Sequence, residues 1–367
     1  MDEITFEPNV LKWARVKRFG PKPDILSANI PLSLGISPED ILKWESGDSQ
    51  PTTSQVKTLS KLYKRAFAVF FLASPPKEDS LPPDYRTIGS KDNVDVSPAA
   101  LLAIRKARIA QSNARSLYEE IGEQYSFKYR QYSLSEDPIQ LASTMRSELD
   151  ITIDQQFRFS KYEDFFEYLR GALETTGVLT RKSGSTDSFS LKDCRAFSLT
   201  DKAPYLIVIN NKDTEGGKIF SLIHEFAHVL IGRSGICNDY SVADPRKANP
   251  IEVFCNKFAG NFLVPRSEFS GFIDTSSIEH LDEEISKAVQ RFKVGRFVIL
   301  RRMRDLGEIS ESFYKSKAKV WEDKPIPTKK REGRFSLRTH LKMNGKRYSS
   351  LVFEAYRNRK ISSSRAS

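Results

Sequence analysis

Two histidines and a glutamate lie within five consecutive residues near the middle of the chain. His224, Glu225 and His228 form the pattern His-Glu-x-x-His within the apolar stretch 221–231. On an α-helix, residues four apart share one face, so both imidazoles can bind one metal ion. Glu225 projects near the same edge, where its carboxylate can act on a water at that metal. The alternative is a chance pentapeptide on a core helix, but two of the four histidines in the chain fall in this one turn.

A catalytic zinc site needs a third protein ligand and an open fourth position. The extended pattern H-E-x-x-H-x-x-G-x-x-H fails here, because Ile231 occupies its glycine position and Ser234 its last histidine position. The next predicted helix, 250–265, has an apolar set for the core and carries Glu252 and Asn256 four residues apart on one edge. Glu252 completes a His-His-Glu site if the two helices pack together. As a residue of the first turn, it would otherwise only stabilise the helix dipole.

These stretches resemble the ImmA/IrrE family of bacterial and phage metallopeptidases. The likeness runs from the strand-like segment 203–211, through Phe220-Ser-Leu-Ile-His-Glu-Phe-Ala-His, to Glu252-x-x-Cys-Asn-x-Phe-Ala and the closing Leu-Val-Pro at 263–265. That combination is far more specific than His-Glu-x-x-His alone. Members of the family cut repressor proteins, and many carry a helix-turn-helix domain in front.

The resemblance also implies a role for each residue of the site. In the family, the two histidines and the later glutamate hold zinc, and the glutamate inside the motif is the catalytic base. The corresponding residues in this chain are the Zn²⁺ ligands His224, His228 and Glu252, and the base Glu225. The group that stabilises the oxyanion is left open between Tyr205 and a residue after Ile231. Asn256 is either a support for the ligands or an ordinary amide on the helix surface.

Residues 1–74 predict a small domain of short helices, at 10–18, 24–30, 38–44, 54–64 and 66–72. Trp44-Glu-Ser-Gly followed by Gln50-Pro-Thr resembles the Cro/repressor (XRE) type of helix-turn-helix. The first half departs from that type, since prolines and extra residues follow the first helix. The expected recognition helix opens with Glu39 and Asp40, where base-reading side chains normally lie, and carboxylates repel phosphates. Binding of DNA and binding of a protein partner therefore both stay open for this domain.

The rest of the chain predicts a linker at 75–96, a peptidase domain at 97–320 and a basic segment at 321–367. Within the peptidase domain, three strands are expected at 178–181, 194–200 and 205–210, among helices at 97–123, 138–148, 161–175, 278–292 and 295–306. The last two helices have helix-turn-helix spacing but are interpreted as part of the peptidase fold. The predicted fold is therefore multidomain and mainly α, with a helix-turn-helix, an α+β zincin-like peptidase with a small three-stranded sheet, and a basic helical tail.

Composition and charge indicate the cellular compartment and the kind of partner to expect. The chain has 367 residues and three cysteines without C-x-x-C spacing, its N-terminus is no signal peptide, and no apolar run reaches 18 residues. We therefore expect a cytoplasmic protein with reduced thiols and no membrane contact. The net charge of +11 is uneven, because the stretch 324–367 has 13 Lys and Arg against 2 Glu. The tail is accordingly the favoured place for contact with a polyanion.

Together these features predict a zinc-dependent endopeptidase that regulates transcription or a stress response by cleaving a partner repressor. The alternative is a DNA-binding regulator, or an antitoxin that acts by binding a cognate toxin, with the metal site structural or little used. Glu225 favours catalysis, because a structural zinc site has no need of a base. The helix-turn-helix resemblance favours the alternative. A scaffold with a vestigial site is a third reading, and the four intact residues argue against it.

Overall fold

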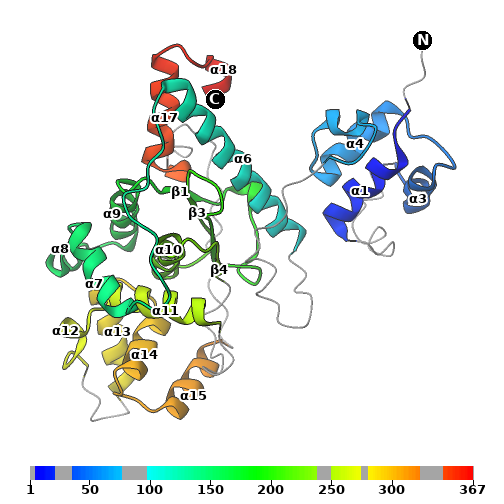
Figure 1. Cartoon of the computed structure of the whole chain (residues 1–367). Coiled ribbons are helices and arrows are strands. Elements are labelled where there is room, and N and C mark those ends of the chain that lie inside the picture. Colours follow the sequence, from blue (N-terminus) through cyan, green and yellow to red (C-terminus); the bar gives the residue numbers. More distant parts are fainter. Residues whose placement is uncertain are drawn as a thin grey trace. The chain divides into compact units, whose positions relative to one another are not determined.

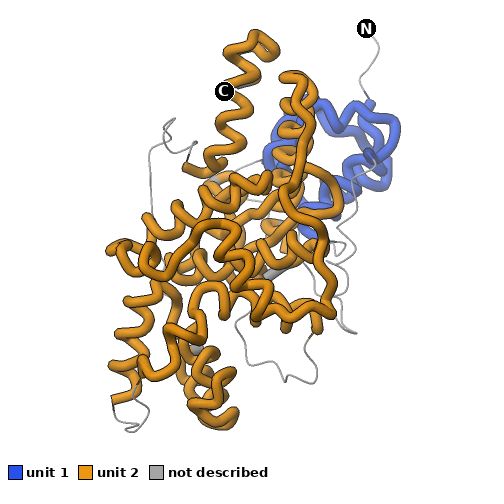
Figure 2. The backbone as a smooth tube through the Cα atoms, turned by 60° about the vertical axis from the view of Figure 1, so that its left-hand side comes forward, with its two compact units in different colours: residues 1–80 blue, residues 81–367 orange. Residues whose placement is uncertain are grey.

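The computed structural model describes residues 5–20, 35–76, 97–237, 249–273, 280–322 and 342–366 (Figure 1). The chain divides into two compact units, unit 1 at residues 1–80 and unit 2 at residues 81–367 (Figure 2). The division falls inside the predicted linker at 75–96, most of which lies outside the described residues. Each unit is considered by itself.

Unit 1 is helical. Its described elements are α1 (Pro8–Phe19), α3 (Pro38–Ser46), α4 (Thr53–Tyr63) and the 3-10 helix η2 (Phe67–Phe71). Four of the five predicted helices are thus present, and the fifth, 24–30, lies outside the described residues. Helix α3 begins as expected, because the Ser37 hydroxyl accepts from the Asp40 amide while the Asp40 carboxylate accepts from the Ser37 amide. Asp40 therefore serves as a cap, which leaves Glu39 as the exposed carboxylate of that turn.

A buried ion pair ties two helices of unit 1 together. The Arg15 guanidinium on α1 donates from Nε and Nη2 to the two carboxylate oxygens of Glu45 on α3, at 2.6 and 2.8 Å. Around this pair lies a core that includes Leu11, Trp44 and Leu59. Removing one partner would leave a buried charge unpaired, so the pair fixes how α1 and α3 meet. That unit 1 is a helix-turn-helix domain stays a prediction.

Unit 2 holds the other elements. Its helices are α6 (Pro98–Ile121), α7 (Pro138–Glu148), α8 (Ile153–Arg158), α9 (Tyr162–Glu174), α10 (Glu215–Leu230), α11 (Pro250–Leu263), α12 (Arg266–Phe269), α13 (Leu281–Phe292), α14 (Arg296–Asp305), α15 (Glu311–Glu322), α17 (Lys346–Arg357) and α18 (Ser363–Ala366), with a 3-10 turn η3 (Ser185–Asp187). Its strands are β1 (Leu179–Lys182), β2 (Ala196–Leu199), β3 (Leu206–Ile209) and β4 (Ile236–Cys237). The prediction of a mainly helical chain with a small sheet is confirmed.

The described strands form one sheet in the order β1-β3-β2-β4. β1 runs parallel to β3, and β2 runs antiparallel to both β3 and β4. The three strands expected from the sequence are β1, β3 and β2. The fourth, β4, was not predicted, because two residues are too short to show an alternating pattern. Among the described strands, β4 pairs with β2 alone and therefore forms one edge of the sheet.

Helices cover both faces of this sheet. Along β3, Leu206 and Val208 belong to a core cluster with α6 and α17, whereas Ile207 and Ile209 belong to the larger cluster around α10. Successive side chains of a strand point to opposite faces, and strands buried on both faces are apolar throughout. α10 consequently lies under one face, while α6 and α17 lie on the other (Figure 1). α13 and α14 contribute to the larger cluster, in line with their interpretation as part of this fold.

The basic segment is part of unit 2, not a separate tail, in its described residues 342–366. Arg170 on α9 donates to the carbonyls of Lys342 and Met343, at 2.5 and 2.8 Å. The Glu174 carboxylate accepts from the backbone amides of Lys346 and Arg347 at the start of α17, at 2.8 and 3.1 Å, where a negative charge also stabilises the helix dipole. The predicted boundary at 320/321 therefore does not separate compact units.

Among the described helices, none combines the length and the apolar character that crossing a membrane requires.

Candidate metal centre

Helix α10 carries the first part of the site and is buried along nearly its whole length. Its residues from Gly216 to Leu230 are buried, as expected for a helix that is apolar on most sides. It begins at Thr214, whose side chain accepts from the Gly217 amide. It ends where Gly232 adopts a left-handed conformation, with φ of +63°, as its place after the apolar run predicts. These two ends define where His224, Glu225 and His228 lie against the sheet.

The start of α10 is further held by a buried ion pair. Asp213 is 4% exposed, accepts from the Thr214 amide at 2.7 Å, and pairs with Arg195 at 2.7 Å. Burial raises the pKa of the Asp213 carboxyl, and the Arg195 guanidinium opposes this rise. A Cβ on Gly217 would lie 2.5 Å from the Asp213 carboxylate. The glycine at position 217 therefore lets the helix start close to this pair.

Helix α11 supplies the third ligand candidate. Asn249 caps its start by accepting from the Ile251 amide, and Pro250 occupies the first turn, where a missing N–H has no cost. α11 packs against α10, and Phe258 and Phe226 meet with their ring centroids 6.4 Å apart. This packing brings Glu252, in the first turn of α11, to the histidines of α10. In the first turn of α11, Glu252 can also stabilise the helix dipole.

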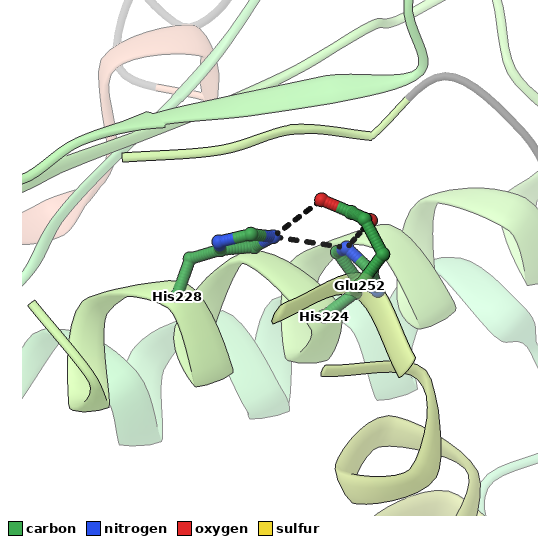
Figure 3. A group of neighbouring side chains, drawn as sticks. All are labelled: His224, His228 and Glu252. Carbon is green, nitrogen blue, oxygen red and sulfur yellow. Dashed lines mark hydrogen bonds and ion pairs between the residues drawn. The ribbon is translucent and has the colours of Figure 1, made fainter. Parts of the chain in front are cut away.

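The three side chains converge on one point (Figure 3). The Nε2 atoms of His224 and His228 lie 3.2 Å apart, Glu252 Oε2 lies 3.2 Å from His224 Nε2, and Glu252 Oε1 lies 3.3 Å from His228 Nε2. A tetrahedral zinc ion with bonds of about 2.0–2.1 Å needs donor atoms roughly 3.3 Å apart. Two imidazoles and a carboxylate at these separations therefore fit a zinc ion.

Neighbouring groups orient the two imidazoles. His228 Nδ1 donates to the carbonyl of Arg233 at 3.2 Å, which leaves Nε2 as the metal-binding atom. The ring of His224 lies against Phe220, with centroids 6.0 Å apart. Both histidines are 1% exposed, whereas the Glu252 side chain is 27% exposed. Solvent thus reaches the group at Glu252.

The protein groups alone keep the carboxylate of Glu252 ionised. Burial would raise the pKa of Glu252, but hydrogen bonds to His224 and His228 and the charges of both rings hold it well below its usual value. An anionic carboxylate beside two imidazoles is the form that binds a divalent cation.

Glu225 has a different environment. Its side chain is fully buried, and burial raises the pKa of its carboxyl, while His228, His224 and the Ser198 hydroxyl act in the opposite direction. A carboxylate that is not a ligand and has an elevated pKa suits a general base better than an ordinary exposed glutamate.

The segment that leads into β4 passes directly over His228. A Cβ on Gly235 would lie 2.5 Å from Cε1 and Nε2 of the His228 ring. The Gly235 amide donates to the Ser198 hydroxyl at 3.2 Å, and the Ser198 amide donates to the Gly235 carbonyl at 3.0 Å. Ser198 therefore joins the edge of the sheet to the neighbourhood of Glu225, and position 235 has room for glycine alone.

We expect Gly235→Ala to weaken zinc binding about 10–100-fold, since moving a group that supports a ligand typically costs that much affinity. The new methyl group displaces either the His228 ring or the β4 segment. Gly171→Ala in α9 is the matched control, because a Cβ there meets nothing within 4 Å. Competition for zinc with a chelating dye measures both affinities. Equal affinities would show that the segment at 235 yields without disturbing His228.

Two residues named from the sequence make no hydrogen bond or ring contact with the three ligand candidates. The ring of Tyr205 packs against Tyr125 and Phe127, with centroids 6.0 and 5.4 Å apart, and Tyr205 has no contact with the three ligand candidates in the described structure. Asn256 is half-buried, and its side chain makes no hydrogen bond to a described residue. Neither belongs to the ligand set, and the roles considered for Tyr205 and Asn256 stay predictions.

Three residues beside the site were not found from the sequence. Ser198 is the single polar residue of β2, and a hydroxyl in an otherwise apolar strand was a usable signal. Gly235 carried no signal, because its role depends on the approach of a strand that the sequence did not predict. Cys255 is a buried thiol on α11 beside His228, and burial raises its pKa. In the sequence it appeared only as a position of the motif Glu252-x-x-Cys-Asn, without a role of its own.

Residues 178–304 match the family Peptidase_M78, described as the IrrE N-terminal-like domain. The match runs from β1 to α14 and includes all three ligand candidates. A comparison with curated proteins found no match for the chain. This part of unit 2 is thus similar to the ImmA/IrrE-type domain, which points to a family of zinc metallopeptidases, while the match does not extend to unit 1.

Proposed function

We propose that this chain is a zinc-dependent endopeptidase that cleaves a partner repressor protein and thereby regulates transcription or a stress response. One observation carries the proposal: the two imidazole Nε2 atoms lie 3.2 Å apart, and each is 3.2–3.3 Å from a carboxylate oxygen of Glu252, next to the buried carboxylate of Glu225, which is not one of the ligand candidates. A structural zinc site has four protein ligands and no need of such a carboxylate. Burying one without a task costs free energy.

Each residue of the site would have its own role in the reaction. His224, His228 and Glu252 hold the ion, which when bound supplies Lewis acidity toward a carbonyl oxygen and lowers the pKa of water. Glu225 accepts a proton from the attacking water and passes it to the leaving amine. Ser198 and the Arg233 carbonyl keep Glu225 and His228 in place. β4 is an edge of the sheet among the described strands and lies beside the centre, so it is suited to pair with the extended backbone of a substrate.

The choice of a repressor as substrate rests on the resemblance to ImmA/IrrE peptidases. An extended, accessible segment of the substrate fits an edge strand better than a folded domain does, because the backbone groups of folded segments are already paired. We therefore expect cleavage in a linker or a terminal segment of the repressor.

A second candidate is regulation by binding, either of DNA or of a toxin. It is favoured by the separate compact unit 1, whose described helices have their own core. For direct reading of DNA, the exposed Glu39 at the start of α3 is unfavourable, because it faces phosphates with a like charge. A protein partner for unit 1 fits that surface better.

Cells that carry the wild-type chain or Glu225→Gln provide the test. Profiling of protein N-termini should reveal new termini in a DNA-binding protein only with the wild type, together with expression of the genes that the protein represses. If both strains have the same N-termini and the same regulated genes, the binding role replaces the peptidase role.

A further inference from the structure

The outward face of α17 forms a groove in unit 2, far along the chain from the metal ligands. The groove has a volume of about 630 Å³, and its lining includes Lys346, Ser350, Phe353 and Arg357, which recur at helical spacing along one side. Phe353 is 66% exposed, and Tyr356, one position before Arg357, is 48% exposed. Large aromatic side chains are usually buried, so two of them exposed on one helix need an explanation.

The opposite side of α17 anchors the helix. Leu351 and Ala355 are buried in the cluster with α6 and the sheet, and Glu174 accepts from the first amides of the helix. Figure 1 shows α17 beside α6, on the other side of the sheet from α10. The outward face is thus held in a defined position, away from the proposed peptidase centre.

This face and the turn after it are strongly basic. Residues 342–366 contain seven Lys and Arg and one acidic residue, Glu354, a balance of +6. Two of the arginines are used within unit 2, since Arg347 pairs with Glu123 and Arg365 with Glu120. The other five cations are exposed and have no ion pair or hydrogen bond from their side chains to any described residue: Lys342 before α17, and Lys346, Arg357, Arg359 and Lys360 on this face and the turn after it.

We propose that this face of α17 binds single-stranded nucleic acid, with a base stacked on Phe353 and the backbone phosphates at Arg357, Arg359 and Lys360. Proteins that bind single strands combine a basic groove with exposed aromatic rings, because every base offers a face for stacking. Ser349, Ser350 and Asn358 add hydrogen-bonding groups to the groove. The proposal is independent of the peptidase function.

The chemistry of the face disfavours other polyanions. A helix that lies on a membrane needs a wide apolar face, whereas here two serines, Asn358 and Glu354 line the groove together with Phe353. A duplex keeps its bases stacked, so it would leave Phe353 without a partner. A single strand uses both the rings and the cations.

Fluorescence anisotropy with the full-length, zinc-loaded chain and an oligothymidine of about 20 nucleotides tests the proposal. We expect binding that weakens with salt. Arg357→Gln/Arg359→Gln/Lys360→Gln should reduce the slope of log affinity against log salt by about 2, since each phosphate contact on a single strand contributes about 0.7. Phe353→Ala should weaken binding roughly 5- to 150-fold, the range for loss of one stacked base, and Phe353→Trp should restore it.

A control with the same change of charge is Lys161→Gln/Lys192→Gln/Lys212→Gln, which removes three exposed lysines elsewhere in unit 2. It should keep the wild-type slope. The proposal is overturned if the wild type does not bind the oligonucleotide, if both triple variants lose the same slope, or if Phe353→Ala binds as wild type does. Tighter binding to a duplex of equal length, or to phosphatidylserine vesicles, would likewise overturn it. All substituted residues are exposed, and retained zinc content confirms that each variant is folded.

Discussion

Glu225→Gln is expected to keep zinc and to cleave its substrate about 10²–10⁴-fold more slowly than wild type, the usual contribution of a general base. The substitution preserves the shape of the side chain and leaves all three ligand candidates in place. It removes the buried carboxylate of Glu225, which lies beside the centre and is not one of the ligand candidates. An uncharged amide accepts a proton poorly, so kcat should fall while KM changes little.

Glu215→Gln is the matched control in the same helix. Glu215 pairs with Lys218 at 3.0 Å at the start of α10, and it has no part in the metal centre. Its rate should stay within a few-fold of wild type. Rates are compared on a peptide that spans the cleavage site identified from the N-termini, with zinc content determined for each preparation. A wild-type rate for zinc-loaded Glu225→Gln would remove Glu225 from the mechanism.

His228→Ala is expected to abolish zinc binding at ordinary zinc concentrations and all cleavage with it. Two donors, His224 and Glu252, would remain, and two ligands do not make a tight zinc site. Because a ligand that binds only the folded state stabilises it, wild type at a zinc concentration of 100 times Kd should gain about 2.7 kcal/mol in free energy of unfolding. The variant should show no such gain.

His280→Ala serves as the control for that experiment, since the His280 side chain is 69% exposed. It should bind one zinc per chain as wild type does. Thermal unfolding with added zinc and with a chelator, together with metal analysis, separates the cases. Stoichiometric zinc in a His224→Ala/His228→Ala chain would place the metal elsewhere.

The core of the metal centre was predictable because its geometry is local. The spacing of His224 and His228 is a property of any α-helix, and the apolar residues around them required a buried one. Glu252 was harder, because its approach depends on how two helices pack, and the family resemblance was needed. Ser198 and Gly235 reach the centre through a strand pairing that no local pattern encodes.

The same difference holds for the fold: features set by neighbouring residues could be predicted from the sequence, and features set by long-range packing could not. Helix starts such as Ser37 and Asn249 have side-chain caps that the sequence displays. The basic segment was interpreted by its charge, although two apolar residues of α17, Leu351 and Ala355, are buried in the core of unit 2. Burial of such side chains stabilises more than exposed charges do, so α17 lies on the body of unit 2.

Zinc K-edge X-ray absorption on the zinc-loaded wild-type chain is the most direct test of the proposed centre. We expect nitrogen and oxygen donors alone, at about 2.0–2.2 Å, with the scattering pattern of two imidazoles. Sulfur at about 2.3 Å would contradict this ligand set. The buried thiol of Cys255 lies beside His228, so a sulfur signal would identify a different, closed site.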